Sequence, residues 1–219
     1  MSLPVEYIVP VQHDAFMADY VPDSELGTLA YLRCGWETGK VPAATRPLMR
    51  FSLVDVPSDF RTIEAELWAN CTTAAAAAVQ ADIYSLLVPE GFTYPSEAWV
   101  EDEVTWNDYK TATGWGTPGG DYTLNIGSFY LPTTTGNFKL LDGTTLVEIV
   151  EYGRSLGAPR VNLLARRTLE GFTSAQIRIA SREAGGSPAG PWLILRGYQR
   201  TVHLVGGVHL VGNTTVASG

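Results

Sequence analysis

The chain has 219 residues, of which 45% are apolar, 11% aromatic and 17% charged. This apolar and aromatic content excludes a disordered protein, and the length is that of one domain, which buries roughly 70% of the surface that its unfolded chain exposes. The net charge of -8 argues against nucleic acid and anionic membranes as direct partners, because such a surface repels phosphate groups.

The N-terminal residues 1–6 lack the basic and apolar segments of a secretory signal. No apolar run reaches the roughly 18 residues needed to span a membrane. We therefore expect no membrane insertion and assembly in a cytoplasm, with an extracellular location as the alternative.

Residues 1–28 contain three prolines and alternate only weakly, which predicts an arm that leads into an edge strand. Strand patterns then recur, and the clearest is 63–70, where apolar side chains alternate with polar ones. Residues 71–78 are rich in alanine but too short to nucleate a helix, so they predict a hairpin connection. The expected strands are 29–36, 48–53, 63–70, 81–87, 160–166, 175–180 and 192–196.

One helix is expected between Asp142 and Gly157. Asp142 or Thr144 can cap its start, and Gly157 precedes a proline where the helix should end. Its apolar stripe consists of Leu146, Ile149 and Val150. Many short strands with one short helix predict an all-β fold, namely an antiparallel β-sandwich of jelly-roll topology over residues 29–200.

Residues 201–219 contain an immediate repeat, because Val-His-Leu-Val-Gly at 202–206 recurs at 208–212. Two short, uncharged segments of this kind expose apolar side chains and unpaired backbone groups, which favours strand addition. This tail either pairs within its own domain or docks on a neighbouring subunit. Its candidate assembly residues are Val202, His203, Leu204, Val208, His209 and Leu210.

Cys34 and Cys71 are the only cysteines, so the chain has no disulfide framework and no four-ligand zinc spacing. Both lie in apolar, strand-like runs, which predicts two buried free thiols, with one bridge between neighbouring strands as the alternative. The acidic residues 101–103 lack the ligand order of a calcium loop and predict a solvated loop, with a bound calcium ion as the minor alternative. We expect no cofactor.

The three histidines do not form a catalytic arrangement. His203 and His209 are six residues apart, which is not the helical spacing of a zinc protease, and no nucleophile-elbow motif is present. We therefore expect a protein that is not an enzyme. Nearly all basic residues are arginines, which favours partly buried contacts with carboxylates, and Arg50, Arg182 and Glu183 are expected in structural ion pairs.

Aromatic residues are the best candidates for recognition. Trp68, Trp106 and Trp192 occur in apolar or strand-like segments and are expected in the core. Trp115 lies between two glycines, where an exposed indole could stack on a sugar ring or anchor a protein interface. The alternative is an indole packed over the edge of the sandwich. The candidate ligand or interface residues are Trp36, Trp115, Tyr109 and Tyr122.

Several short motifs occur in an order that resembles the DNRLRE domain, a family of jelly-roll sandwiches of which some are classed as carbohydrate-binding modules. They are Arg-Phe-Ser-Leu at 50–53, Ile-Glu-Ala-Glu-Leu-Trp at 63–68, Trp99 with Glu-Val-Thr-Trp-Asn at 103–107, Thr-Leu-Val-Glu-Ile-Val at 145–150, and Ile-Ala-Ser-Arg-Glu at 179–183 before Pro-Trp-Leu at 191–193. The resemblance covers residues 29–196 and implies a jelly roll that binds glycans. The chain departs from the family in its terminal arm, its duplicated tail, and the lack of a signal peptide and an attached enzyme.

Two functions follow as hypotheses. The first is a non-catalytic structural protein of a virion, expected in a tailed phage as a capsid decoration or tail-associated subunit. Its arms would hold neighbouring protein subunits, with a homo-oligomer expected. The alternative is a carbohydrate-binding module that recognises a surface polysaccharide through loop aromatics.

Overall fold

The computed structural model of the protein describes residues 3–37, 39–41, 43–86, 99–122, 124–171, 175–185 and 190–199, together with the backbone of 204–205, 208–211 and 214–217. Strands dominate this part of the chain, and its one α-helix is α1 (Thr144–Ser155). The described residues include no helix with both the length and the apolar character needed to cross a membrane.

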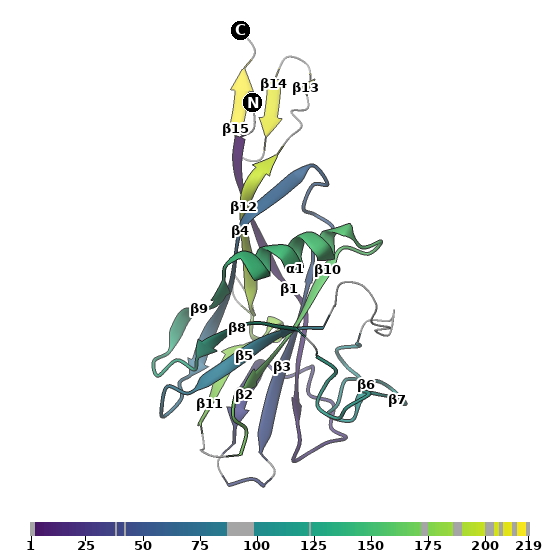
Figure 1. Ribbon diagram of the computed structural model, residues 1–219, viewed down its shortest axis with the longest axis vertical. Coiled ribbons are helices and arrows are strands. Elements are labelled where there is room, and N and C mark those ends of the chain that lie inside the picture. The colour runs from purple at the N-terminus through teal and green to yellow at the C-terminus, as the bar shows by residue number, and fades with distance from the viewer. Residues whose placement is uncertain are drawn as a thin grey trace.

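Ten antiparallel strands form the main sheet (Figure 1). Their bounds are β1 Leu3–Ala18, β2 Tyr31–Trp36, β3 Ala44–Ser52, β4 Phe60–Thr73, β5 Gln80–Ser85, β8 Leu124–Tyr130, β9 Gly136–Asp142, β10 Arg160–Arg167, β11 Ala175–Ala180 and β12 Trp192–Gln199. Two smaller sheets contain β6 (Asp108–Lys110) with β7 (Thr113–Gly114), and β13 (Leu204–Val205), β14 (Val208–Val211) and β15 (Thr214–Ala217). A single 3-10 turn, η1 (Arg182–Ala184), precedes β12 among the described residues.

The long strand β1 closes the main sheet. Residues 3–10 pair with β12, and residues 11–18 pair with β3 after a shift of register near His13. The ring therefore runs β1-β12-β4-β11-β2-β3 and returns to β1, while β10, β5 and β8 continue from β3 and β9 from β4. The predicted all-β class with one helix is confirmed, but the sheet is a closed barrel rather than a clear two-sheet sandwich.

Residues 3–18 are not the arm that the sequence predicts. They form β1, which is paired along both halves, and Ala15, Phe16 and Met17 in its second half are almost fully buried. Pro4 and Pro10 interrupt the polar side of the strand and obscure its apolar alternation. That alternation runs through Val5, Tyr7, Val9 and Val11, which all contribute to or pack against the main core.

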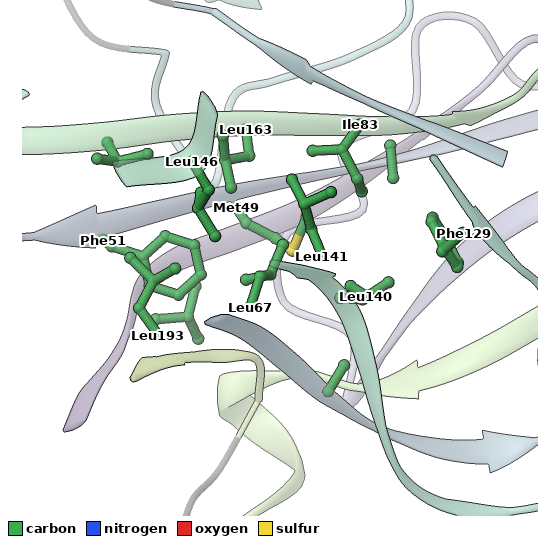
Figure 2. Packing of buried hydrophobic residues seen from close by; sticks show 14 of the residues in the cluster. Met49, Phe51, Leu67, Ile83, Phe129, Leu140, Leu141, Leu146, Leu163 and Leu193 are labelled. Atoms are coloured by element: carbon green, nitrogen blue, oxygen red, sulfur yellow. The ribbon is translucent and has the colours of Figure 1, made fainter. Parts of the chain in front are cut away.

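The main core lies between the sheet and α1 (Figure 2). Leu146 of α1 points toward Phe51, Met49 and Leu163, and all four side chains are less than 1% exposed. The predicted stripe of Leu146, Ile149 and Val150 is confirmed as the buried face of α1. The residue at the start of the helix is Gly143, with no side-chain cap, so neither predicted capping residue caps it.

One connection differs from the predicted one. Residues 71–78 are not a hairpin loop, because β4 continues to Thr73 and β5 pairs with β10 and β8 instead of β4. The chain after β4 therefore crosses to another part of the barrel. The sequence also gives no clear signal for β8 and β9, whose described residues are largely exposed.

Arginines join segments that are distant in sequence, as predicted. Arg46 on β3 donates from Nε and Nη2 to the two carboxylate oxygens of Glu170, at 2.9 and 2.7 Å, and from Nη1 to the carbonyl of Gly119. Its guanidinium also lies 4.5 Å from the ring centre of Trp106. The bidentate pair with Glu170 fixes the guanidinium in place. Its contacts with Gly119 and Trp106 then hold the loop that contains β6 and β7 against the barrel.

Among the residues that the structure describes, Arg50 has no carboxylate partner, so the predicted ion pair is not found there. Its Nε donates to Oδ1 of Asn162 and its Nη2 to the carbonyl of Trp99, and the guanidinium lies over the Trp99 ring at 4.6 Å. Burial and the nearby Arg160 lower the pKa of Arg50 to about 10. The two cysteines, Cys34 and Cys71, are buried and free, which confirms the prediction of free thiols.

Candidate functional site

Trp115 is buried, so the prediction of an exposed loop indole is wrong. The residue is 9% exposed, and its Nε1 donates to the carbonyl of Thr105 at 3.1 Å. Its ring lies 5.6 Å from the ring of Tyr109 and belongs to a second core cluster with Met17 and Leu164. Its position instead agrees with the alternative prediction, in which the Trp115 indole packs over the edge of the fold.

Tyr122 packs against the same second cluster, whereas Trp36 lies apart at the end of β2. The Tyr122 hydroxyl accepts a hydrogen bond from Nη1 of Arg166, and its ring centre lies 4.5 Å from that of Tyr84. Trp36 is half-buried and lies near Gly171. The four aromatic candidates therefore do not form one exposed platform in the described structure.

Two other tryptophans form a pair on the outer face of the barrel. Trp68 on β4 lies opposite Trp192 on β12, with ring centres 6.4 Å apart and ring planes within 12° of parallel. Their neighbours Leu67 and Leu193 point into the core, so the two indoles alternate outward. Trp192 is 7% exposed, which confirms that it is buried, although it lies outside the main core cluster. Trp68 is only half-buried, so the prediction of a core residue is wrong for Trp68. The alternation of residues 63–70 already places Trp68 on the face opposite to Leu67, that is, on the outer face.

The tail residues lie partly in a separate antiparallel sheet. Leu204 belongs to β13, and Val208, His209 and Leu210 belong to β14, with Leu204 paired to His209 and Val205 to Val208. β14 also pairs with β15, in the register Leu210 to Thr215. Val202 and His203 lie outside the described residues. In the described part of the chain, no ladder joins this sheet to the main sheet.

A narrow part of the barrel leads toward this tail. We call it the stem and define it as residues 3–8 of β1, 60–66 of β4 and 194–199 of β12, which are hydrogen-bonded side by side. Figure 1 shows β4 and β12 continuing past α1 toward the C-terminal sheet. Ile8, Ile63 and Tyr198 on the stem are 60%, 48% and 42% exposed. Ile63 and Tyr198 line a groove of about 320 Å³ with Pro4.

A carboxylate cluster joins β1 to two loops on the other part of the barrel. Glu101 accepts the backbone N–H of Asp14 at its Oε1, at 2.7 Å, and Nη2 of Arg182 at its Oε2, at 2.7 Å. His13 Nδ1 lies 3.0 Å from the same Oε2. Asp14 in turn accepts the backbone N–H of Arg182 at 2.9 Å. Asp14 is fully buried and Glu101 is 6% exposed, so these contacts hold β1, the turn at 101–103 and η1 together.

Burial, together with the nearby Glu183 and Glu101 carboxylates, raises the pKa of Asp14 to about 8, although the N–H of Arg182 opposes the shift. The ordinary value in an unfolded chain is about 3.9. The folded protein therefore keeps this proton up to about pH 8, whereas the unfolded chain loses it near pH 4. It follows that the contribution of Asp14 to stability falls as the pH rises between these two values.

Asp14→Asn tests this pH dependence, because an amide does not ionise. We expect the melting temperature of Asp14→Asn, measured relative to that of the wild type, to be higher at pH 8.5 than at pH 5. The measurement is thermal unfolding of both proteins at the two pH values in a buffer with a chelator. A difference between the two proteins that does not change with pH would contradict the raised pKa.

A larger pocket, of about 720 Å³, lies between the end of α1 and the turn before β4. Arg154 on its wall pairs with Glu151 at 2.8 Å, donates to the carbonyl of Pro57, and lies over the ring of Phe60. Glu151 also accepts the backbone N–H of Thr62. These charged groups serve the packing of α1 against the stem and are not placed as an acid–base pair around an open centre.

The fold and these sites define a closed β-barrel protein with an additional C-terminal sheet. Comparison with known proteins found no matching family model and no matching curated protein.

Proposed function

We propose that this chain is a non-catalytic structural subunit whose C-terminal sheet and stem bind a neighbouring copy of the same chain. The observation that carries the proposal is the separate three-stranded sheet β13-β14-β15, whose described residues pair only with one another. The tail that contains it, residues 201–219, has no Asp, Glu, Lys or Arg.

A sheet of this size is not stable by its backbone pairing alone. A small sheet needs an apolar face or another element to pack against before it is independently stable. The strands β13 and β15 are at its two edges, and edge strands present unpaired backbone groups to other chains. In the proposed assembly, a neighbouring subunit supplies a packing surface for this sheet and a strand for its edges.

The stem supports the same proposal. Three large apolar side chains, Ile8, Ile63 and Tyr198, are exposed on the strands that lead into the tail. Their charged neighbours are already paired with one another, since Nε of Arg196 lies 2.7 Å from Glu6 and its Nη1 lies 3.3 Å from Glu66. Arg196 also lies 3.8 Å from Glu64, so one guanidinium is shared by three carboxylates. The exposed surface therefore combines apolar side chains with partly neutralised charges, as in an interface with a polar rim.

For the biological setting, we propose a virion, with the chain as a capsid decoration or tail-associated subunit of a tailed phage. Particles of this kind are built from repeated subunits, and such a lattice offers the adjacent copy that the tail requires. The finer fold that we propose is the DNRLRE-type jelly roll, because the sequence motifs fall on β3, β4, α1, β11 and β12 in the family order.

Glycan binding is the alternative function, and one observation favours it. The half-buried Trp68 indole lies on the outer face of the sheet, stacked on the buried ring of Trp192, and its Nε1 donates to Glu66 at 3.0 Å. Aromatic faces beside polar groups are suited to sugar rings. Retention of the chain on a polysaccharide affinity gel, lost in Trp68→Ala, would support this alternative.

A full-length variant tests the assembly proposal. Val208→Asp combined with Leu210→Asp places two charges in the central strand of the C-terminal sheet. We expect light scattering after size exclusion to give a multiple of 23.7 kDa for the wild type and 23.7 kDa for the variant, with unchanged circular dichroism.

The matched control is Leu169→Asp. Leu169 is 64% exposed in the turn after β10, so this variant adds a charge away from the tail and stem and should assemble like the wild type. A wild type that has the mass of one chain at all concentrations, or a Val208→Asp/Leu210→Asp variant that assembles fully, would refute the proposal.

A further inference from the structure

Three carboxylates from three distant segments converge at one point of the barrel. Asp14 comes from β1, Glu101 from the turn at 101–103 and Glu183 from η1, and one oxygen of each lies within 4.8 Å of the others. This group is separate from the tail and the stem.

One oxygen of this cluster is buried without a partner. Asp14 is fully buried, and its Oδ1 has no hydrogen-bond donor in the described structure, although Oδ2 accepts the N–H of Arg182 at 2.9 Å. Glu101 likewise accepts a backbone hydrogen bond, from the N–H of Asp14 to its Oε1. Buried carboxyl oxygens are normally protonated, hydrogen-bonded or bound to a metal. This oxygen therefore carries the proton that Asp14 retains up to about pH 8, or binds a cation that displaces the proton.

We infer that Asp14, Glu101 and Glu183 form a binding site for a divalent, oxygen-seeking cation, with Ca²⁺ as the best match. Ca²⁺ binds carboxylate oxygens at about 2.3 to 2.6 Å, so ligands on opposite sides of the ion are about 5 Å apart. The observed spacing allows one ion to reach all three residues. Glu183 is the most exposed of the three, and its side leaves room for the water ligands that Ca²⁺ also requires.

Arg182 is the counter-ion that such a cation displaces. Its Nη2 lies 2.7 Å from Oε2 of Glu101 and 2.9 Å from Oε1 of Glu183, so it neutralises two of the three carboxylates. The Arg182 side chain is 45% exposed, which allows it to turn outward into solvent. Removing the charge of Arg182 should therefore strengthen cation binding. It should also lower the stability of the protein without the cation, because two ion pairs are lost.

The test is calorimetric titration of CaCl₂ into chelator-treated, dialysed full-length protein, with thermal unfolding measured in parallel. We expect saturable Ca²⁺ binding and a raised melting temperature in the wild type. Arg182→Gln should melt lower than the wild type without Ca²⁺, bind Ca²⁺ several-fold more tightly, and regain stability when Ca²⁺ is added. Glu183→Gln should bind about tenfold or more weakly, because it loses a ligand.

Glu148→Gln is the matched control, since it removes the same charge from an exposed position on α1 and should bind Ca²⁺ like the wild type. Glu183 is exposed, so Glu183→Gln is expected to fold and keeps the test decisive if Asp14 variants do not. The inference fails if neither the wild type nor Arg182→Gln binds Ca²⁺. It also fails if Glu183→Gln and Glu148→Gln bind Ca²⁺ equally. These outcomes do not depend on the oligomeric state of the chain.

Discussion

Replacing Trp115 with alanine is expected to lower the free energy of unfolding by about 3 to 5 kcal/mol, the range measured for large aromatic residues in protein cores. The indole is 9% exposed and fills the space among Met17, Leu48 and Leu164 in the second core cluster. The substitution leaves a cavity there and removes the hydrogen bond from Nε1 to the carbonyl of Thr105. Urea unfolding followed by circular dichroism measures the loss.

Trp36→Ala is the matched control for Trp115→Ala. Trp36 is half-buried at the end of β2, so the same change of side chain removes less buried surface and should cost less than half as much stability. Equal losses in the two variants, or no loss for Trp115→Ala, would contradict the burial of Trp115. The comparison also separates a packing role from a binding role, since an exposed ligand platform can be truncated with little loss of stability.

Gly35→Ala is expected to destabilise the barrel by about 3 kcal/mol or more, because strain and overpacking combine at this position. Gly35 has a φ of +131°, which residues with a Cβ rarely adopt, and an added Cβ would lie 2.2 Å from the carbonyl oxygen of Ala175. The contact is with the backbone of β11, which pairs with β2 along its whole length, so it cannot be relieved by a change of rotamer.

The control for Gly35→Ala is Gly157→Ala, after α1. A Cβ at Gly157 would meet nothing within 4 Å, and its φ is not in the left-handed region, so we expect stability within about 0.5 kcal/mol of the wild type or slightly above it. Chemical denaturation of both variants measures the difference. If Gly35→Ala is as stable as Gly157→Ala, the close approach of β2 and β11 is incorrect.

The parts of the fold that the sequence predicts are those with a strong local period. The alternation of residues 63–70 gives β4, and the spacing of Leu146, Ile149 and Val150 gives the buried face of α1. The helix keeps one side toward the core throughout, and β4 does so at Ala65, Leu67 and Ala69, where a local pattern is enough. Ile63, which the same alternation places on the inward face, is 48% exposed, because the register between β4 and β12 shifts between Thr62 and Glu64.

Closure of the barrel depends on pairings between distant strands, which local patterns do not encode. β1 pairs with β12 and β3, and Pro4 and Pro10 interrupt the pattern that would have identified it as a long strand. Local patterns do not predict the carboxylate cluster for the same reason, because Asp14, Glu101 and Glu183 are brought together only by tertiary structure. Trp115 looked exposed because it lies between glycines, but the loop folds back on the barrel and Arg46 fixes it there.

Amide hydrogen exchange of residues 204–217 in the intact chain, measured at a high and a low protein concentration, tests assembly through the tail most directly. If the C-terminal sheet is stabilised by a neighbouring copy, its amides should be protected at high concentration and should lose most of that protection on dilution, while β4 and β12 remain protected. Protection of residues 204–217 that is the same at both concentrations would show that the sheet is stable within its own chain, and would contradict assembly through the tail.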